Sequence, residues 1–141
     1  MTDQPHIEEF DHTADIGFRI VSPSLAALLI RAAQFMFNII CPECRINARL
    51  RKDIIVEADD YEQLLVNWLS ELNYYFQTEQ FLVAAIEKIE VQDYQLRATI
   101  LGERIDPDRH AIRIEIKAVT FHKIYVQQVP AGWAAQVIFD I

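Results

Sequence analysis

An acidic motif near the start of this 141-residue chain has residue types suited to metal binding or catalysis. The run Asp11-His12-Thr13-Ala14-Asp15 places two carboxylates and an imidazole within five residues. Such groups bind divalent metals or perform general acid–base chemistry. The same run also suits a simple turn, because Asp and Thr side chains accept hydrogen bonds from backbone amides where a chain enters a strand. On pattern alone, the turn is the favoured interpretation.

A second acidic pair ends the chain, where Asp140 is followed by the α-carboxylate of Ile141. These residues close an alternating apolar segment, and termini are normally loose unless something holds them. Two fixed carboxylates repel each other, and a hard cation such as Ca²⁺, which takes six to eight oxygen ligands, would relieve that repulsion. A strand that simply ends in solvent is an equally good interpretation.

The only two cysteines form the motif Cys41-Pro42-Glu43-Cys44. A single C-x-x-C is either half of a zinc site or a redox pair. The sequence contains no second cysteine pair, and its four histidines show no ligand spacing. The motif also follows a predicted helix, where the helix dipole disfavours a thiolate. We therefore expect two ordinary free thiols, with a zinc shared between two chains as the alternative.

A charged loop is predicted over residues 102–110, which contain Glu103, Arg104, Asp106, Asp108 and Arg109. Binding of a partner and simple solvation of charge explain this loop equally well. The sequence shows no phosphate-binding glycine-rich loop, no nucleophile elbow and no Walker motif.

Composition limits the function classes further. The chain has 21 Asp plus Glu against 13 Lys plus Arg, a net charge of −8, with 52% hydrophobic residues. This composition is typical of a compact globular protein. Its acidity disfavours stand-alone binding to nucleic acid or to an anionic membrane. No membrane span or signal peptide is recognisable, so we expect one cytoplasmic domain over residues 1–141.

Two amphipathic helices are predicted, over residues 24–40 and 61–77. Ser22, followed by Pro23, is the expected cap of the first helix, and Asp59 or Asp60 of the second. Period-two patterns predict strands over the following residues: 16–20, 45–56, 82–91, 94–101, 111–129 with a bulge near Ala118, and 133–141.

Strands grouped between two helices predict an α+β fold, with the helices packed on a largely antiparallel or mixed sheet. The two strand–helix–strand segments are also consistent with an internal duplication, although sequence identity between the halves does not show one.

The chain resembles the archease family in motifs that extend over nearly its whole length. The matching segments, in order, are residues 11–17 (DHTADIG), 64–72 (LLVNWLSEL), 102–103 with 109–110 (GE and RH), 117–122 (KAVTFH) and 137–141 (VIFDI). The Cys41/Cys44 pair is not part of the family pattern.

This resemblance implies a small α+β protein that assists a GTP-dependent RNA-splicing ligase by promoting its guanylylation and turnover. It also implies a divalent-metal site, with calcium the preferred ion, formed by Asp15, Asp140 and the carboxylate of Ile141. Asp11 is a less secure ligand, and His12 and Thr13 would shape the site without ligating. For these groups to meet, the first strand must start beside the end of the last strand.

We therefore expect a non-enzymatic activator of an RNA ligase that contacts RNA only indirectly. One alternative is a metal-dependent phosphoester hydrolase with His12 as acid/base and Asp11 and Asp15 as ligands. Another is an acidic, chaperone-like scaffold that binds basic partners and loses them as salt rises. The sequence does not determine the oligomeric state.

Overall fold

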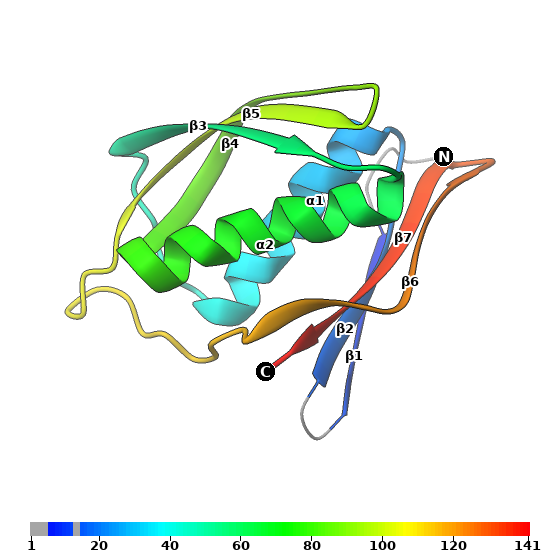
Figure 1. Ribbon diagram of the computed structural model, residues 1–141. Coiled ribbons are helices and arrows are strands. Elements are labelled where there is room, and N and C mark those ends of the chain that lie inside the picture. The colour runs from blue at the N-terminus through cyan, green and yellow to red at the C-terminus, as the bar shows by residue number, and fades with distance from the viewer. Residues whose placement is uncertain (1–5, 13–14) are drawn as a thin grey trace.

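The computed structural model describes residues 6–12 and 15–141 (Figure 1). Within these residues the elements follow in the order β1 (His6–His12), β2 (Asp15–Ser22), α1 (Leu25–Ile40), β3 (Leu50–Glu57), α2 (Tyr61–Glu79), β4 (Phe81–Gln92), β5 (Gln95–Arg104), β6 (Ala118–Val129) and β7 (Gly132–Asp140).

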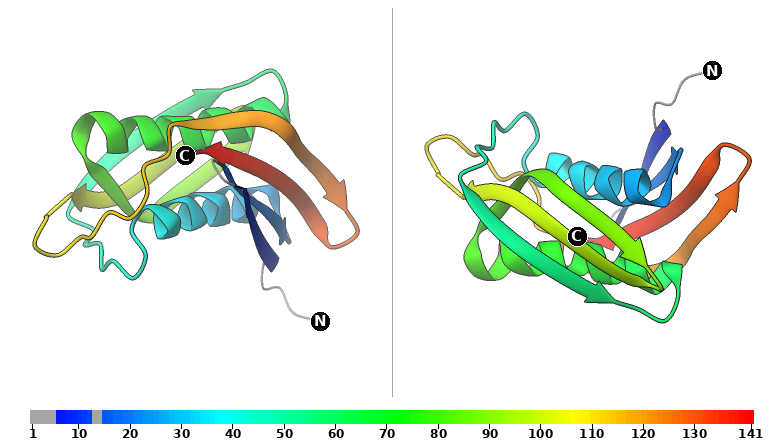
Figure 2. Two further views of the ribbon diagram at one scale, coloured as in Figure 1. Left: turned by 90° about the horizontal axis from the view of Figure 1, so that it is seen from below. Right: turned by 90° about the horizontal axis from the view of Figure 1, so that it is seen from above.

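The strands form two separate sheets, with the helices between them (Figure 2). One sheet has the strand order β1-β2-β7-β6 and the other β3-β5-β4, and every neighbouring pair is antiparallel. Helix α1 packs on β4, β2 and β7, whereas α2 packs on β6 and on all three strands of the smaller sheet. The predicted α+β class, with two helices on antiparallel sheets, is confirmed.

Helix α1 forms because its apolar residues recur on one side, where Leu28, Leu29, Ala32 and Met36 are fully buried. Its N-cap is Ser24, whose hydroxyl accepts a hydrogen bond from the Ala27 backbone N–H. The prediction of a cap at residue 22 was wrong because that residue precedes a proline and stays extended as the last residue of β2.

Helix α2 begins where predicted, with Asp60 as its N-cap accepting a hydrogen bond from the Gln63 backbone N–H at 2.7 Å. It ends at Glu79, followed by Gln80 in the left-handed conformation. Trp68 is fully buried, and its indole N–H donates to the Leu29 carbonyl of α1 at 2.9 Å, which joins the two helices. No helix in the described part of the chain has the length and apolar character needed to cross a bilayer.

The strands differ from the predictions in three places. The edge strand β1 was not predicted, the strand expected over 45–56 starts only at Leu50, and the strand expected over 111–129 starts only at Ala118. Residues 110–117 instead form an extended strap that packs on α2, where the Asn73 and Gln77 side-chain amides both donate to the Ile116 carbonyl. The register shift lies between Thr120 and Tyr125, not at residue 118.

The two strand–helix–strand segments have different connections. The first passes from β2 through α1 to β3 and so crosses from one sheet to the other. The second passes from β3 through α2 to β4 and returns to the same sheet, with β5 between its two strands. The topology therefore does not support the predicted internal duplication.

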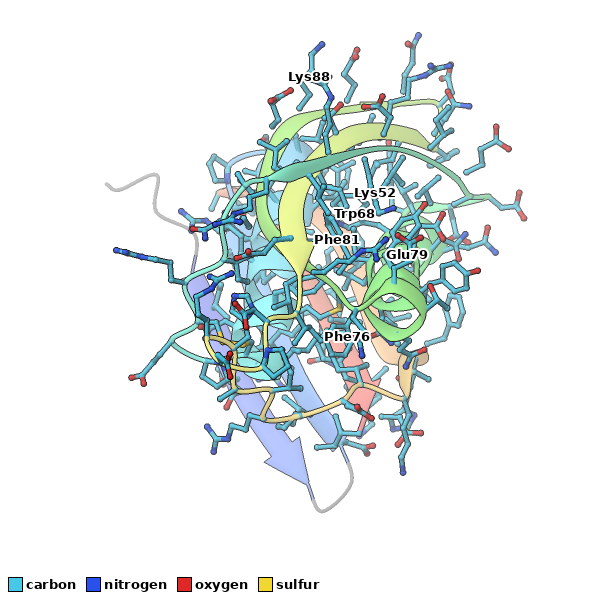
Figure 3. The ribbon with its side chains drawn as sticks, turned by 90° about the vertical axis from the view of Figure 1, so that its left-hand side faces the viewer. Lys52, Trp68, Phe76, Glu79, Phe81 and Lys88 are labelled. Atoms are coloured by element: carbon cyan, nitrogen blue, oxygen red, sulfur yellow. A yellow bond between two sulfur atoms is a disulfide. The ribbon has the colours of Figure 1, made fainter. Side chains whose placement is uncertain are left out.

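The side chain of Lys52, a residue of β3, extends to the C-terminal end of α2 (Figure 3). The ammonium of Lys52 is 2.6 Å from the Glu79 carboxylate. It also lies 4.7 Å from the ring centre of Tyr75 and 5.5 Å from that of Phe81. The ion pair and the two rings together stabilise a charge that is only 25% exposed.

Close approach of β4 and β5 requires a glycine at position 102. A Cβ added to Gly102 would lie 1.9 Å from the Leu82 carbonyl oxygen. We expect Gly102→Ala to lower the free energy of unfolding by about 2 kcal/mol, because backbone must move to admit the methyl group. Urea unfolding measures this loss. Arg97→Ala, at an exposed position of the same strand, is the control, and equal stability of the two variants would contradict the prediction.

Candidate functional site

The two predicted aspartate ligands lie directly opposite each other on neighbouring strands. In the antiparallel pairing of β2 with β7, Asp15 is the partner of Asp140, and Ile16 is the partner of Phe139. The start of β2 therefore lies beside the end of β7 (Figure 1), as the sequence hypothesis required.

Burial determines which face of the sheet carries the aspartates. Ile16 and Phe18 of β2, with Val137 and Phe139 of β7, are buried against the helices. Because side chains alternate along a strand, Asp15 and Asp140 share the opposite face. Residues directly opposite on antiparallel strands have Cβ atoms about 5 Å apart, so the two carboxylates can reach one ion.

The end of β7 is held from several sides. The Lys117 backbone N–H, at the end of the strap, donates to the Asp140 carbonyl at 2.8 Å. Ala118 of β6 is the cross-strand neighbour of Asp140 on the side away from Asp15. The next residue, Ile141, packs against the core. Its α-carboxylate is therefore held next to Asp140.

The donor set suits a hard divalent cation. Within the described residues neither Asp15 nor Asp140 forms an ion pair. Those residues also contain no group of three His, Cys, Asp or Glu side chains able to hold a metal. The third donor of the predicted site is instead the α-carboxylate of Ile141. Three carboxylates provide oxygen ligands only, as calcium prefers, and the metal site stays a prediction.

The rest of the acidic motif is described only in part. His12 is the register partner of Asp15, which places its backbone beside the aspartate pair. The side chains of Asp11 and His12, and the whole of Thr13, lie outside the described residues. The predicted roles of these three residues therefore stay predictions.

A second charged cluster lies at the end of β5, which extends to Arg104, and in the loop that follows, so the loop predicted over 102–110 starts only at residue 105. Glu103 is only 4% exposed and accepts hydrogen bonds from the Arg109 guanidinium at 2.6 and 3.3 Å and from the Asn47 backbone N–H at 2.6 Å. The Arg109 hydrogen bonds are the main reason that the pKa of Glu103 falls from 4.5 to about 2, and the Asn47 hydrogen bond adds to the shift.

His110 completes this cluster and is 3% exposed. Its Nδ1 accepts a hydrogen bond from the Asp106 backbone N–H at 2.9 Å, so the proton of the neutral ring lies on Nε2. That nitrogen is 3.0 Å from the Arg45 carbonyl and 3.3 Å from Glu103. Solvated charge therefore does not describe Glu103 and His110, which join the loop to residues 45–47. Arg109 and Asp106 are local partners, but Asn47 and Arg45 are distant in sequence, and no local pattern identifies these two.

The expectation of free thiols was wrong, because Cys41 and Cys44 form a disulfide. Glu43 adopts a left-handed conformation with φ of 62°, and the resulting turn brings the two Cα atoms to 5.5 Å. This separation is in the range that a disulfide spans. With both sulfurs bonded to each other, a zinc shared between chains is excluded for this state.

A hollow of about 470 Å³ lies between the β3–α2 and β4–β5 connections. Glu57, Asp59, Asp93 and Tyr94 are among the residues that line it. It contains none of the predicted ligands.

Comparison with known proteins gives a family match over almost the whole chain. Residues 7–141 match the model of the Archease protein family (MTH1598/TM1083). The Protein archease of Methanosarcina mazei is 35% identical over 138 residues, covering 95% of this chain and 94% of that protein. The Protein archease of Pyrococcus furiosus is 36% identical over 138 residues, covering 95% and 97%.

Solved structures show the same fold. The solution structure of Methanobacterium thermoautotrophicum protein 1598 is 30% identical, with a TM-score of 0.77, and covers 96% of this chain and 98% of that one. A crystal structure from Thermotoga maritima, described as an archease and possible chaperone, is 19% identical, with a TM-score of 0.68 and coverage of 95% and 96%. At that identity it supports the fold alone.

The aspartate pair makes a prediction about stability. In metal-free buffer, Asp15→Asn should raise the free energy of unfolding by on the order of 0.5 kcal/mol, because it removes repulsion between like charges on opposite strands. Chemical denaturation with a chelator present measures this gain. Glu90→Gln, on an exposed strand position of the other sheet, is the control. A loss of stability in the Asp15 variant would contradict the proposed repulsion.

The Glu103 cluster makes a prediction about pH. Because the pKa of Glu103 is lower in the folded protein, its ionised form stabilises the fold above about pH 4.5, and that contribution is lost as the pH falls towards 2. The stability difference between wild type and Glu103→Gln should therefore shrink from about pH 5 to pH 2. Urea unfolding across this range is the measurement, with the exposed Glu90→Gln as control. A difference independent of pH would show that the hydrogen bonds do not lower the pKa.

Proposed function

This chain belongs to the archease family, and on that basis we propose that it activates a GTP-dependent RNA-splicing ligase. In this role it is a protein cofactor in RNA end joining and tRNA splicing that promotes guanylylation and repeated turnover of the ligase. The observation that carries the proposal is the direct cross-strand pairing of Asp15 with Asp140, which gives the molecule a fixed acidic end.

The acidic end would be the part of the molecule that engages the ligase. Asp15, Asp140 and the carboxylate of Ile141 would hold a divalent cation, with calcium the preferred ion. The bound cation would neutralise their repulsion and order the end of the sheet. The Lys117 backbone hydrogen bond to Asp140 and the packing of Ile141 against the core support this proposal. Such contacts would preorganise the site for contact with a partner.

Charge supports a protein partner over direct contact with RNA. The chain carries a net charge of −8, and phosphate backbones are bound mainly by Lys and Arg. An acidic protein is instead complementary to the basic surface of an enzyme that itself holds RNA, and such complementarity speeds association. Contact with RNA in this proposal is therefore indirect.

A ligation assay with a cognate ligase at limiting GTP tests the proposal. Wild-type protein should increase the yield of joined RNA, and Asp15→Ala or Asp140→Ala should abolish the increase while the fold is retained. Glu90→Ala is the matched control, because it also removes one carboxylate from a strand, but in the other sheet. Circular dichroism of each variant checks that the fold is intact.

Other outcomes would distinguish the remaining functions. Full stimulation by both aspartate variants would refute the proposed role of the acidic end. Hydrolysis of a phosphoester by this protein without any ligase would instead identify a metal-dependent hydrolase. Binding to basic proteins that survives loss of both aspartates and fades with salt would identify an acidic scaffold.

A further inference from the structure

The disulfide lies where the end of α1 meets the strap. Cys41 is the C-cap of α1, and the Ile40 carbonyl just before it accepts a hydrogen bond from the Arg113 backbone N–H at 2.8 Å. The proposed role of the acidic end does not involve this bond, and the family motifs do not include either cysteine. The disulfide therefore needs its own explanation.

The two sulfur-bearing residues differ in accessibility. Cys41 is 3% exposed, whereas Cys44 is partly exposed on the turn made by Glu43. A groove of about 160 Å³ between α1 and β4 is lined by both cysteines and by apolar residues that include Phe37 and Ile46. Cys44 is thus the more accessible of the two residues to an attacking thiolate, whereas Cys41 is shielded.

The surroundings also accommodate the reduced form of Cys41. Its Sγ is 3.6 Å from the Ala111 carbonyl oxygen of the strap. In the disulfide this sulfur has no proton to donate, but a thiol at the same position has an acceptor already in place. Because Cys41 lies at the C-terminal end of a helix, the dipole favours the protonated thiol over the thiolate. Reduction therefore leaves no buried unpaired group.

We propose that Cys41–Cys44 is a thiol–disulfide exchange site whose reactant is a protein dithiol of the thioredoxin type. One thiolate of the dithiol attacks Sγ of Cys44, which forms a mixed disulfide and releases Cys41, and Cys41 takes up a proton. The second thiolate of the dithiol then attacks the dithiol-protein sulfur of the mixed disulfide. This attack closes the disulfide of the dithiol protein and releases Cys44, which takes up another proton. In the net reaction this chain gains two electrons and two protons, and the dithiol becomes a disulfide.

Trapping of the mixed disulfide tests the order of attack. The air-oxidised, folded protein is mixed with a thioredoxin whose resolving cysteine is replaced by serine, and free thiols are then alkylated. Peptide mapping should find thioredoxin joined to Cys44 and the alkyl group on Cys41. Attachment at Cys41 would overturn the proposed order. Reaction only after denaturation would show an inert structural disulfide, and two free thiols in the air-oxidised protein would show that no such site exists.

Single variants compare the two thiols directly. In Cys41→Ser only Cys44 remains, and in Cys44→Ser only Cys41 remains. Maleimide should label the folded Cys41→Ser variant on the order of tenfold faster than the folded Cys44→Ser variant, because only the former presents an accessible sulfur. Equal rates would contradict the assignment of Cys44 as the attacked residue.

Melting temperature checks that exchange is reversible in the folded state. Reduction of the wild type should lower its melting temperature by about 5 °C, the size expected for opening a four-residue loop, with full recovery on reoxidation. The Cys41→Ser/Cys44→Ser double variant should melt at one temperature with or without reductant. Irreversible loss of the wild-type transition on reduction would mean that the bond is a structural requirement and not an exchange site.

Discussion

The register between β2 and β7 is the constraint on which the rest of the acidic end depends. Side chains alternate across a sheet, so a slip of β2 by one residue against β7 would turn Ile16 to solvent and Asp15 into the core, and Asp15 would no longer share a face with Asp140. Burial of the apolar set against the helices therefore also fixes which carboxylates meet. In this way an ordinary packing requirement positions the charged groups of the proposed metal site.

The strap over residues 110–117 connects the acidic end to the rest of the molecule. Its Ile116 side chain is fully buried, and α2 holds its carbonyl through two side-chain amides. The strap begins at the Glu103–Arg109–His110 cluster and ends at the backbone hydrogen bond from Lys117 to Asp140. One end of the strap is therefore held by a hydrogen-bonded ion pair, and the other end by a backbone hydrogen bond to the end of β7.

Local pattern was sufficient to predict both helices, because each buries a single apolar stripe. It failed where partners distant in sequence decide the structure. Alternation over residues 112–116 resembled a strand, yet those residues pack on a helix, and β1 is recognisable only once β2 is its partner. Glu103 accepts a hydrogen bond from the Asn47 backbone N–H, 56 positions away, and the disulfide depends on the backbone conformation of Glu43. The pairing of Asp15 with Asp140 was inferred because the family resemblance linked the two ends of the chain.

Calcium titration by isothermal calorimetry tests the central claim most directly, since it needs neither ligase nor RNA. The account predicts one calcium ion bound per chain, and an affinity at least about tenfold lower when either Asp15→Asn or Asp140→Asn removes one ligand charge. The Glu90→Gln control should bind as the wild type does. Unchanged calcium affinity in both aspartate variants would contradict the claim that the β2–β7 register builds a metal site.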